Sequence, residues 1–479
     1  MVICSVFFFC LAILVASFLF GNKIPPPHIR FWGILAGCIL FLSSWSMFNY
    51  LVEKRPFTDY LLFRSKCEIF PIPLPDRFRT GEIGEVLKKN NRIEIGRLFE
   101  KGNFSPSQPF PRWNVVFLSV ESWRSDAVQV MPQTLALIKS GIYLKNHLAT
   151  SNGTLPCVYC LYSGLYPFPF EKISSGNNIS SWISFMKKCG YLVKTFNSSR
   201  IDYQSIYQGF EQILGPESAD YCQTTRLALD ETLKELGNPG FHLIQAELYN
   251  THLSYYYPPA YEIFKPAGSE KTDFMYSAPT KEKIEGMRNR YLNSNVFLDY
   301  LLQDFFAKVK EKGFDKNTVF VLFGDHGESF GEDGSLGHYT APGIVQFRVP
   351  CAIWAPGLIP REILTPTQHL DIIPTLGHLL GFKWNNLPGK DVFRDENAEL
   401  VNIDSATQKI ILRRKETMSL FELNWFGELR WIVTTRNDFS IDPELAKLYD
   451  MENLPKLARL VREDTQAILK AFSYGQSPP

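Results

Sequence analysis

The sequence has almost no net charge. Its 50 Lys and Arg residues nearly balance 49 Asp and Glu residues, which leaves a formal net charge of +1. No basic block dominates, and this argues against nucleic acid as the main partner. Internal repeats and low-complexity tracts are also missing. With 45% hydrophobic and 21% charged residues, the 479-residue chain should fold into two to four structural units.

Charge is missing altogether from two apolar segments near the N-terminus, residues 1–20 and 31–52. Each is long enough to cross a bilayer as a helix. The alternative for residues 1–20 is a cleaved signal peptide, but the segment lacks a basic n-region and a good small-residue cleavage site. We therefore predict two N-terminal transmembrane helices within residues 1–52.

The basic residues around these segments leave the orientation open. Lys23 and Arg30 lie in the short loop between the segments and favour a cytoplasmic loop, with both termini outside. Lys54 and Arg55, directly after the second segment, favour the opposite orientation. Residues 53–112 are rich in proline and polar side chains, and we interpret them as a juxtamembrane connector.

Cysteine is scarce, with nine in the chain. Three lie in the apolar segments, and the other six are an even number that leaves disulfide pairing open. Cys157 and Cys160 form a lone C-x-x-C. This spacing is typical of two small apolar residues on one helix face, and redox or metal chemistry is the alternative.

From residue 113 to 395, short apolar runs alternate with helical stretches. The predicted strands are residues 114–120, 191–196, 241–248, 317–323 and 349–355, and the predicted helices are 156–164, 179–189, 221–237 and 281–312. This alternation predicts an α/β fold with a mostly parallel sheet covered by helices on both faces. Residues 396–479 predict antiparallel strands and a closing helix, which form a small C-terminal α+β subdomain.

Polar side chains directly follow two of the predicted strands, where ligands bind in such sheets. Glu121 follows NVVFLSV, and Asp325 and His326 follow TVFVLF in the sequence GDHGES. The alternatives are an acid that caps the next helix and a polar loop with a structural histidine. The DHGE sequence directly after an apolar strand, with Gly337-His338 further on, is the more specific signal.

Thr154 lies at the start of a predicted helix in NGTLPCVYC. Pro156 suits a first helical turn, because its missing N–H costs no hydrogen bond there. Thr154 is therefore either a helix N-cap or a nucleophile, since the N–H groups of a helix N-terminus can also hold a tetrahedral anion.

Four side chains would offer three oxygens and one imidazole nitrogen: Glu121, Thr154, Asp325 and His326. That set suits one divalent ion, zinc or manganese, with magnesium and calcium as alternatives. The ion would lower the pKa of the Thr154 hydroxyl, as phosphoryl or sulfuryl transfer requires. His252, after the third apolar run, and His338 could bind substrate oxygens or protonate a leaving group. The alternative for His252 is a loop histidine among aromatic residues.

Taken in order, these segments resemble the sulfatase-like branch of the alkaline phosphatase superfamily over residues 114–453. QHLDIIPTLGHLLG is similar to the family's D-I-x-P-T-L helix, and KLYDMENLP resembles its L-Y-D-L-x-x-D-P turn. Sulfatases carry C-x-P-S-R, whose Cys becomes formylglycine, and they usually open with paired acids. Here Thr154 stands in place of that Cys, Val158 in place of the Arg, and Glu121 is a single acid.

These departures match the family's membrane-anchored transferases: lipoteichoic acid synthases, phosphoglycerol transferases and phosphoethanolamine transferases. The resemblance implies an extracytoplasmic catalytic domain in residues 113–395, a plasma or inner membrane location and a lipid or lipid-linked substrate. It also suggests a phosphate contact for Arg200, whose alternative is a surface arginine. Those enzymes usually have more than two spans, which is a further departure.

The resulting hypothesis is a metal-dependent enzyme that moves a phosphoryl headgroup from a lipid through Thr154. The first alternative is a sulfatase-like hydrolase, a phosphodiesterase or sulfuric ester hydrolase with water as the acceptor. The second is a non-catalytic lipid sensor or partner platform on the same fold. The sequence leaves the oligomeric state open.

Overall fold

The computed structural model of the chain describes residues 91–93, 102–107, 112–167, 180–197, 207, 209–214, 221–268, 280–395, 399–405, 407–423, 428–437, 443–449 and 451–473. The two predicted transmembrane segments and Arg200 lie outside these residues. Within them, no helix is both long enough and apolar enough for a bilayer crossing. The chain divides into two units. Residues 86–442 with 458–479 form the larger one, and residues 1–85 with 443–457 form the smaller one, which includes helix α12 (Pro443–Lys447).

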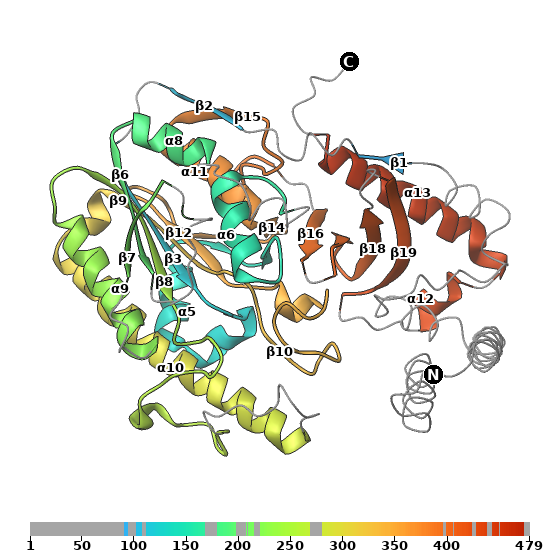
Figure 1. The fold of residues 1–479 in the computed structure, drawn as a ribbon, viewed down its shortest axis with the longest axis horizontal. Coiled ribbons are helices and arrows are strands. Elements are labelled where there is room, and N and C mark those ends of the chain that lie inside the picture. The colour runs from blue at the N-terminus through green and yellow to red at the C-terminus, as the bar shows by residue number, and fades with distance from the viewer. Residues whose placement is uncertain are drawn as a thin grey trace, which may run out of the picture. The chain divides into compact units, whose positions relative to one another are not determined.

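A mixed sheet of eight strands forms the centre of the larger unit (Figure 1). In spatial order its strands are β13 (Arg361–Ile363), β4 (Ile142–Leu144), β12 (Cys351–Trp354), β9 (Thr318–Gly324), β3 (Asn114–Val120), β8 (Phe241–Leu248), β6 (Tyr191–Asn197) and β7 (Glu211–Leu214). From β9 to β7, neighbouring strands are parallel. The predicted α/β fold is confirmed, and the sheet is mixed because β12 is antiparallel to both of its neighbours.

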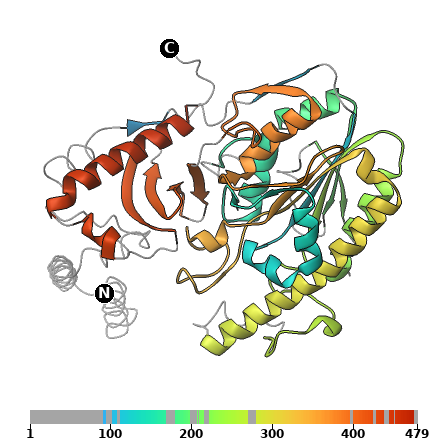
Figure 2. The same ribbon diagram turned by 180° about the vertical axis from the view of Figure 1, so that it is seen from behind.

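Alternate side chains of β3 point to opposite faces of the sheet, and both faces are buried. Val115 and Phe117 join a core with α6 (Thr154–Ser163), α8 (Ser181–Lys188) and α11 (Ile372–Leu380). Val116 and Leu118 join the opposite core with α5 (Pro132–Lys139), α9 (Tyr221–Leu236) and α10 (Lys281–Glu311). Figures 1 and 2 show these two helical layers. Burial on both faces explains why β3 is a continuous apolar run.

Most predicted elements of this layer system occur within two residues of their expected bounds. Helix α6 begins at Thr154, two residues before the expected start. Strand β12 begins only after Pro350, which has no backbone N–H to donate to a neighbouring strand. Strands β4, β7 and β13 were not predicted, because three or four residues are too few to display a periodicity.

A second sheet of five antiparallel strands follows in the same unit (Figure 1). Its order is β1 (Asn91–Arg92), β19 (Glu428–Arg436), β18 (Thr417–Leu423), β17 (Lys409–Arg413) and β16 (Leu400–Asp404). The helix α13 (Leu454–Ala471) corresponds to the expected closing helix. The strand β16 was not anticipated, and the division of the chain at residue 396 stays a prediction.

Two short strands lie inside the segment interpreted as a connector, residues 53–112. Strand β1 pairs with β19, and β2 (Asn103–Pro106) pairs antiparallel with β15 (Phe382–Asn385). The described end of that segment is therefore hydrogen-bonded into sheets. These strands of two and four residues are too short to show an alternating hydrophobic pattern in a segment rich in proline.

Candidate active site

The carboxyl ends of β3 and β9 bring Glu121 and Asp325 together. The two strands are parallel neighbours, and Val120 pairs with Gly324 in their register. The backbone N–H of Asp325 donates to the carbonyl of Val120 over 3.1 Å, so the chain leaves both strands at the same level. Two acidic side chains 204 positions apart in sequence thus become buried neighbours.

Thr154 is the first residue of helix α6, and Gly153 is its N-cap. Its hydroxyl Oγ1 lies 3.3 Å and 3.2 Å from the two carboxylate oxygens of Glu121. The same atom lies 3.2 Å from Nε2 of His326. Of the two readings of Thr154, the N-cap is therefore wrong, because the hydroxyl points to the acidic strand ends and Gly153 occupies the cap position.

His326 presents one particular ring nitrogen to the carboxylates. Its Nδ1 lies 2.9 Å from the carbonyl oxygen of Gly327 and can only donate there, so Nε2 faces the carboxylates and carries the lone pair when the ring is neutral. Nε2 lies 3.3 Å from Oε1 of Glu121 and 3.4 Å from Oδ2 of Asp325. This is the orientation that a metal-binding imidazole requires.

The donor set fits a divalent cation. Oδ1 of Asp325 accepts the backbone N–H groups of Ser122 and His326, over 2.9 Å and 2.7 Å, whereas the buried Oδ2 accepts no hydrogen bond. The ligand atoms of Glu121, Asp325 and His326 all lie within 4.8 Å of one another. Tetrahedral zinc with bonds of about 2.0–2.1 Å needs ligands roughly 3.3–3.4 Å apart, close to the spacings observed around Thr154 and His326.

The electrostatics of the cluster favour a cation as well. Burial raises the pKa of Asp325 well above its usual value, and the charge of Glu121 raises it further. Burial also acts to raise the pKa of Glu121, but the charge and hydrogen bond of His326 outweigh it and lower that pKa. A divalent ion would supply the positive charge that allows both buried carboxyls to ionise.

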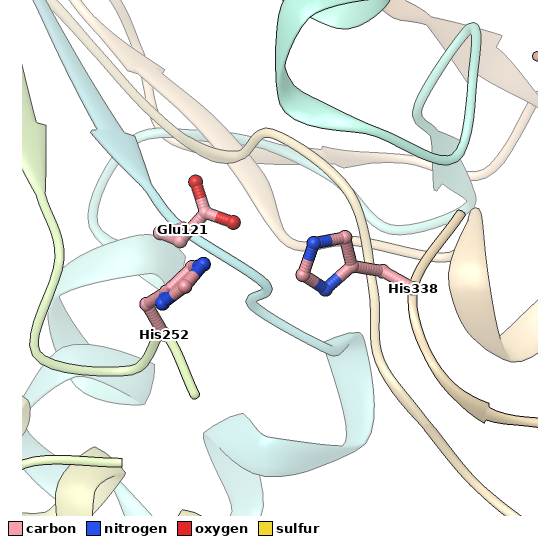
Figure 3. Close-up of side chains that lie close together, drawn as sticks. All are labelled: Glu121, His252 and His338. Atoms are coloured by element: carbon pink, nitrogen blue, oxygen red, sulfur yellow. The ribbon is translucent and has the colours of Figure 1, made fainter. Parts of the chain in front are cut away.

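His252 and His338 both lie close to Glu121 (Figure 3), and the ring of His338 also packs against that of His326, with centroids 4.4 Å apart. A ring nitrogen of each lies within 4.8 Å of the other and of the Glu121 carboxylate. His252 follows β8 and places Nδ1 2.6 Å from the carbonyl oxygen of Leu253. The structure thus brings together all six site residues predicted from strand ends and loops. The seventh, Arg200, lies outside the described residues.

Glu328 belongs to the same cluster and was not predicted as a site residue. It is fully buried, with Oε2 lying 2.7 Å from Nδ1 of His338, and Oε1 accepting the hydroxyl of Tyr255 over 2.8 Å. Burial acts to raise the pKa of Glu328, but the charge and hydrogen bond of His338 lower it. Glu328 is the last residue of the DHGE sequence, but only its partner His338 was predicted as a site residue.

The C-x-x-C pair carries no sign of redox chemistry. Cys157 and Cys160 are buried on α6, and neither forms a disulfide. Burial raises the pKa of both far above the usual value, so they are protonated. The Cys157 thiol donates to the carbonyl of Ser151 over 3.1 Å, a contact within the chain that leads to Thr154.

A family model described as Sulfatase matches residues 113–382, more than half of the chain. The chain belongs to the sulfatase family. This α/β fold with acidic residues, a histidine and a hydroxyl at the strand ends is therefore the family's fold, and the resemblance predicted from the motifs is confirmed.

Its relatives include both hydrolases and synthases. Lipoteichoic acid synthase 2 of Bacillus subtilis is 22% identical over 392 residues, which cover 74% of this chain and 57% of that protein. Choline-sulfatase of Rhizobium meliloti is 27% identical over 209 residues, covering 42% and 39%. The chain thus spans about half the length of the curated relatives it matches. The phosphonate monoester hydrolase SpPMH from Silicibacter pomeroyi has the same fold, with a TM-score of 0.61 at 17% identity over 75% of this chain and 96% of that one.

Proposed function

We propose that this chain is a membrane-anchored, metal-dependent transferase with an extracytoplasmic catalytic domain. It moves a phosphoryl headgroup, of the phosphoglycerol or phosphoethanolamine type, from a membrane lipid to an acceptor through Thr154. The relation to lipoteichoic acid synthase 2 supports a lipid-linked substrate. The membrane anchor rests on the uncharged segments 1–20 and 31–52.

The observation that carries this proposal is the place of Thr154. Its hydroxyl lies within 3.3 Å of a carboxylate and an imidazole that fit a divalent ion, at the first residue of a helix. The exposed N–H groups of that helix end can hold the phosphoryl oxygens. A threonine there can form a phosphoester and lose it again, whereas it has no route to the formylglycine of a sulfatase.

Glu121, Asp325, His326 and Thr154 would hold the ion. When bound, the ion would lower the pKa of the Thr154 hydroxyl and neutralise charge on the phosphoryl group. The Thr154 hydroxyl gives its proton to solvent, and its oxygen attacks phosphorus as the bond to the lipid oxygen breaks. His338 or His252 protonates that leaving oxygen. An acceptor hydroxyl then attacks the phosphothreonine and gives its proton to the same histidine, while the bond from phosphorus to the Thr154 oxygen breaks. Two half-reactions through one nucleophile predict ping-pong kinetics.

The Glu328→Gln variant tests whether His338 is the acid. The substitution removes the negative charge beside the protonated imidazole, and supporting partners of this kind contribute about 10- to 100-fold. We expect kcat to fall by about that factor for a lipid substrate. A nitrophenyl phosphodiester should be nearly unaffected, because its leaving group needs no proton. An equal loss on both substrates would contradict the acid role.

A second candidate function is hydrolysis, which the relation to choline-sulfatase supports. The two functions differ in what takes the headgroup. Purified full-length protein in detergent would be given phosphatidylglycerol or phosphatidylethanolamine vesicles with a glycerol-containing acceptor. We expect diacylglycerol and a headgroup-modified acceptor, with kinetics that give parallel double-reciprocal lines. Release of free phosphorylated headgroup, at a rate independent of the acceptor, would select the hydrolase.

A further inference from the structure

The strand β16 of the second sheet runs alongside the chain that leads to Thr154. The backbone N–H of Ile403 donates to the carbonyl of Thr150 over 2.8 Å, and Ser151 forms a parallel bridge with Ile403. The Ser151 hydroxyl donates to the carbonyl of Ile403 over 2.7 Å. The approach to the nucleophile is therefore paired with a strand about 250 positions later in the sequence.

Asn152, two residues before Thr154, is the centre of a buried polar network. Its side-chain NH₂ lies 2.9 Å from Oδ1 of Asp404, 3.3 Å from Oε1 of Gln346 and 3.2 Å from the carbonyl of Ala341. Its side-chain oxygen accepts the backbone N–H of Ser405 over 3.2 Å. Both polar atoms of this amide therefore have hydrogen-bond partners. Asp404 belongs to the second sheet, and Gln346 and Ala341 belong to the 341–346 loop.

The same residue also holds the loop that carries His338. The carbonyl of Asn152 accepts the backbone N–H of Tyr339 over 2.8 Å. A Cβ at Gly153 would lie 2.4 Å from the ring of Tyr339, so the two segments pack at a distance that only glycine allows. Gln346 donates to the hydroxyl of Thr340 over 2.8 Å and closes the network on the other side.

The centre of the network is fully buried. Asn152, Gln346 and Asp404 have no exposed surface. In such surroundings a hydrogen bond is stronger than in water, and a donor or acceptor left without a partner is strongly destabilising. These partners therefore fix the orientation of Asn152. Asn152 in turn fixes the backbone of Thr154, two residues later, and its carbonyl holds the loop that carries His338.

We propose that Asn152 is a positioning residue, held by Asp404 of the second sheet, that sets the distance between the Thr154 hydroxyl and His338. This inference rests on the proposed function in taking Thr154 as the nucleophile. It assigns a role in the reaction to the second sheet, whose side chains make no contact with the Glu121–Asp325–His326 cluster among the interactions of the described residues.

The test exchanges donor and acceptor between the two side chains. Asn152→Asp places a carboxylate against Asp404, so the segment is pushed out of place. A misplacement of about 1 Å can cost roughly 100-fold, and we expect kcat to fall by about that factor with little change in KM. Asp404→Asn alone should cost little, because its amide can turn its oxygen to Asn152. The double variant restores the donor–acceptor pair between residues 152 and 404, although the new carboxylate still faces Oε1 of Gln346 and the carbonyl of Ala341. It should therefore regain part of the loss, about tenfold in kcat.

Hydrogen exchange of the full chain in detergent, followed by mass spectrometry, supplies a readout that needs no turnover. Peptides covering residues 149–156 and 336–346 should exchange faster in Asn152→Asp and regain protection in the double variant. Ser419→Ala is the control, because that buried hydroxyl bonds Thr434 within the second sheet over 2.7 Å. It should lower Tm with turnover and exchange near Thr154 unchanged.

The outcomes separate the two proposals. Full turnover and unchanged local exchange in Asn152→Asp would overturn the positioning role, as would a double variant no better than the single one. If the wild-type protein turns over no phosphodiester, the proposed function is wrong, and the exchange pattern alone decides whether Asn152 and Asp404 hold the two segments.

Discussion

The Thr154→Ala variant is expected to lose transfer activity by about 10⁴- to 10⁶-fold, the scale on which removal of an attacking side chain acts in other enzymes. Without the hydroxyl there is no atom to accept the headgroup, so a phosphorylated protein intermediate should be absent as well. The substitution changes a partly buried side chain at the first helical position, where alanine is a good helix former. Tm should therefore stay close to that of the wild type.

The measurement combines turnover of a fluorescent lipid donor with intact-mass analysis of the protein quenched in acid. Thr154→Ser is the matched control, because it keeps the hydroxyl and should retain measurable turnover and a mass shift at residue 154. A Thr154→Ala protein that turned over at the wild-type rate would remove the basis of the proposed mechanism.

The Asp325→Asn variant is expected to change activity and stability in opposite directions. Asn keeps an Oδ1 for the N–H groups of Ser122 and His326, but loses the charged oxygen that would bind the ion. We expect the bound metal to fall from about one ion per chain to nearly none, with kcat reduced by at least about 10³-fold. At a pH above the raised pKa of Asp325, the metal-free variant should melt about 2–4 °C above metal-free wild type, because a buried charge beside Glu121 has been removed.

The pH dependence of the stability of the metal-free protein tests the ionisation of Asp325. Burial and the charge of Glu121 raise the folded-state pKa of Asp325. The folded chain thus binds more protons than the unfolded one, and its stability should fall as pH rises from about 4 through that raised pKa. Asp325→Asn should lack this loss. Melting curves across this range, with and without added zinc, measure it.

Asp371→Asn is the matched control for the buried aspartate. Burial raises the pKa of Asp371 to about 6, yet both of its oxygens accept backbone N–H groups, from Gln368 and Lys390. An amide there places a donor against a donor, so Tm should fall while metal content and turnover per folded protein stay unchanged. A stabilised Asp371→Asn protein, or a metal-replete Asp325→Asn protein, would contradict the assignment of Asp325 as a ligand.

Apolar runs predicted the strands that build the site. Strands β3, β8 and β9 appear almost at their expected residues, because strands buried on both faces need continuous apolar side chains. Once such strands are parallel neighbours, residues that follow them must meet at one edge. Local sequence therefore indicated that Glu121 and Asp325–His326 form one cluster, and NGTLP indicated that Thr154 lies at a helix N-terminus.

Tertiary structure alone decided how these groups are supported. The pairing of His338 with Glu328 depends on the β10–β11 hairpin (Ser329–Phe330 and Leu336–Gly337), and the hydroxyl that holds Glu328 comes from Tyr255, 73 positions away. The contact of Asn152 with Asp404 spans 252 positions. Local periodicity reports which face of an element is buried. It carries no information about which distant polar group completes a hydrogen bond, because that choice depends on how the sheets and loops pack in space.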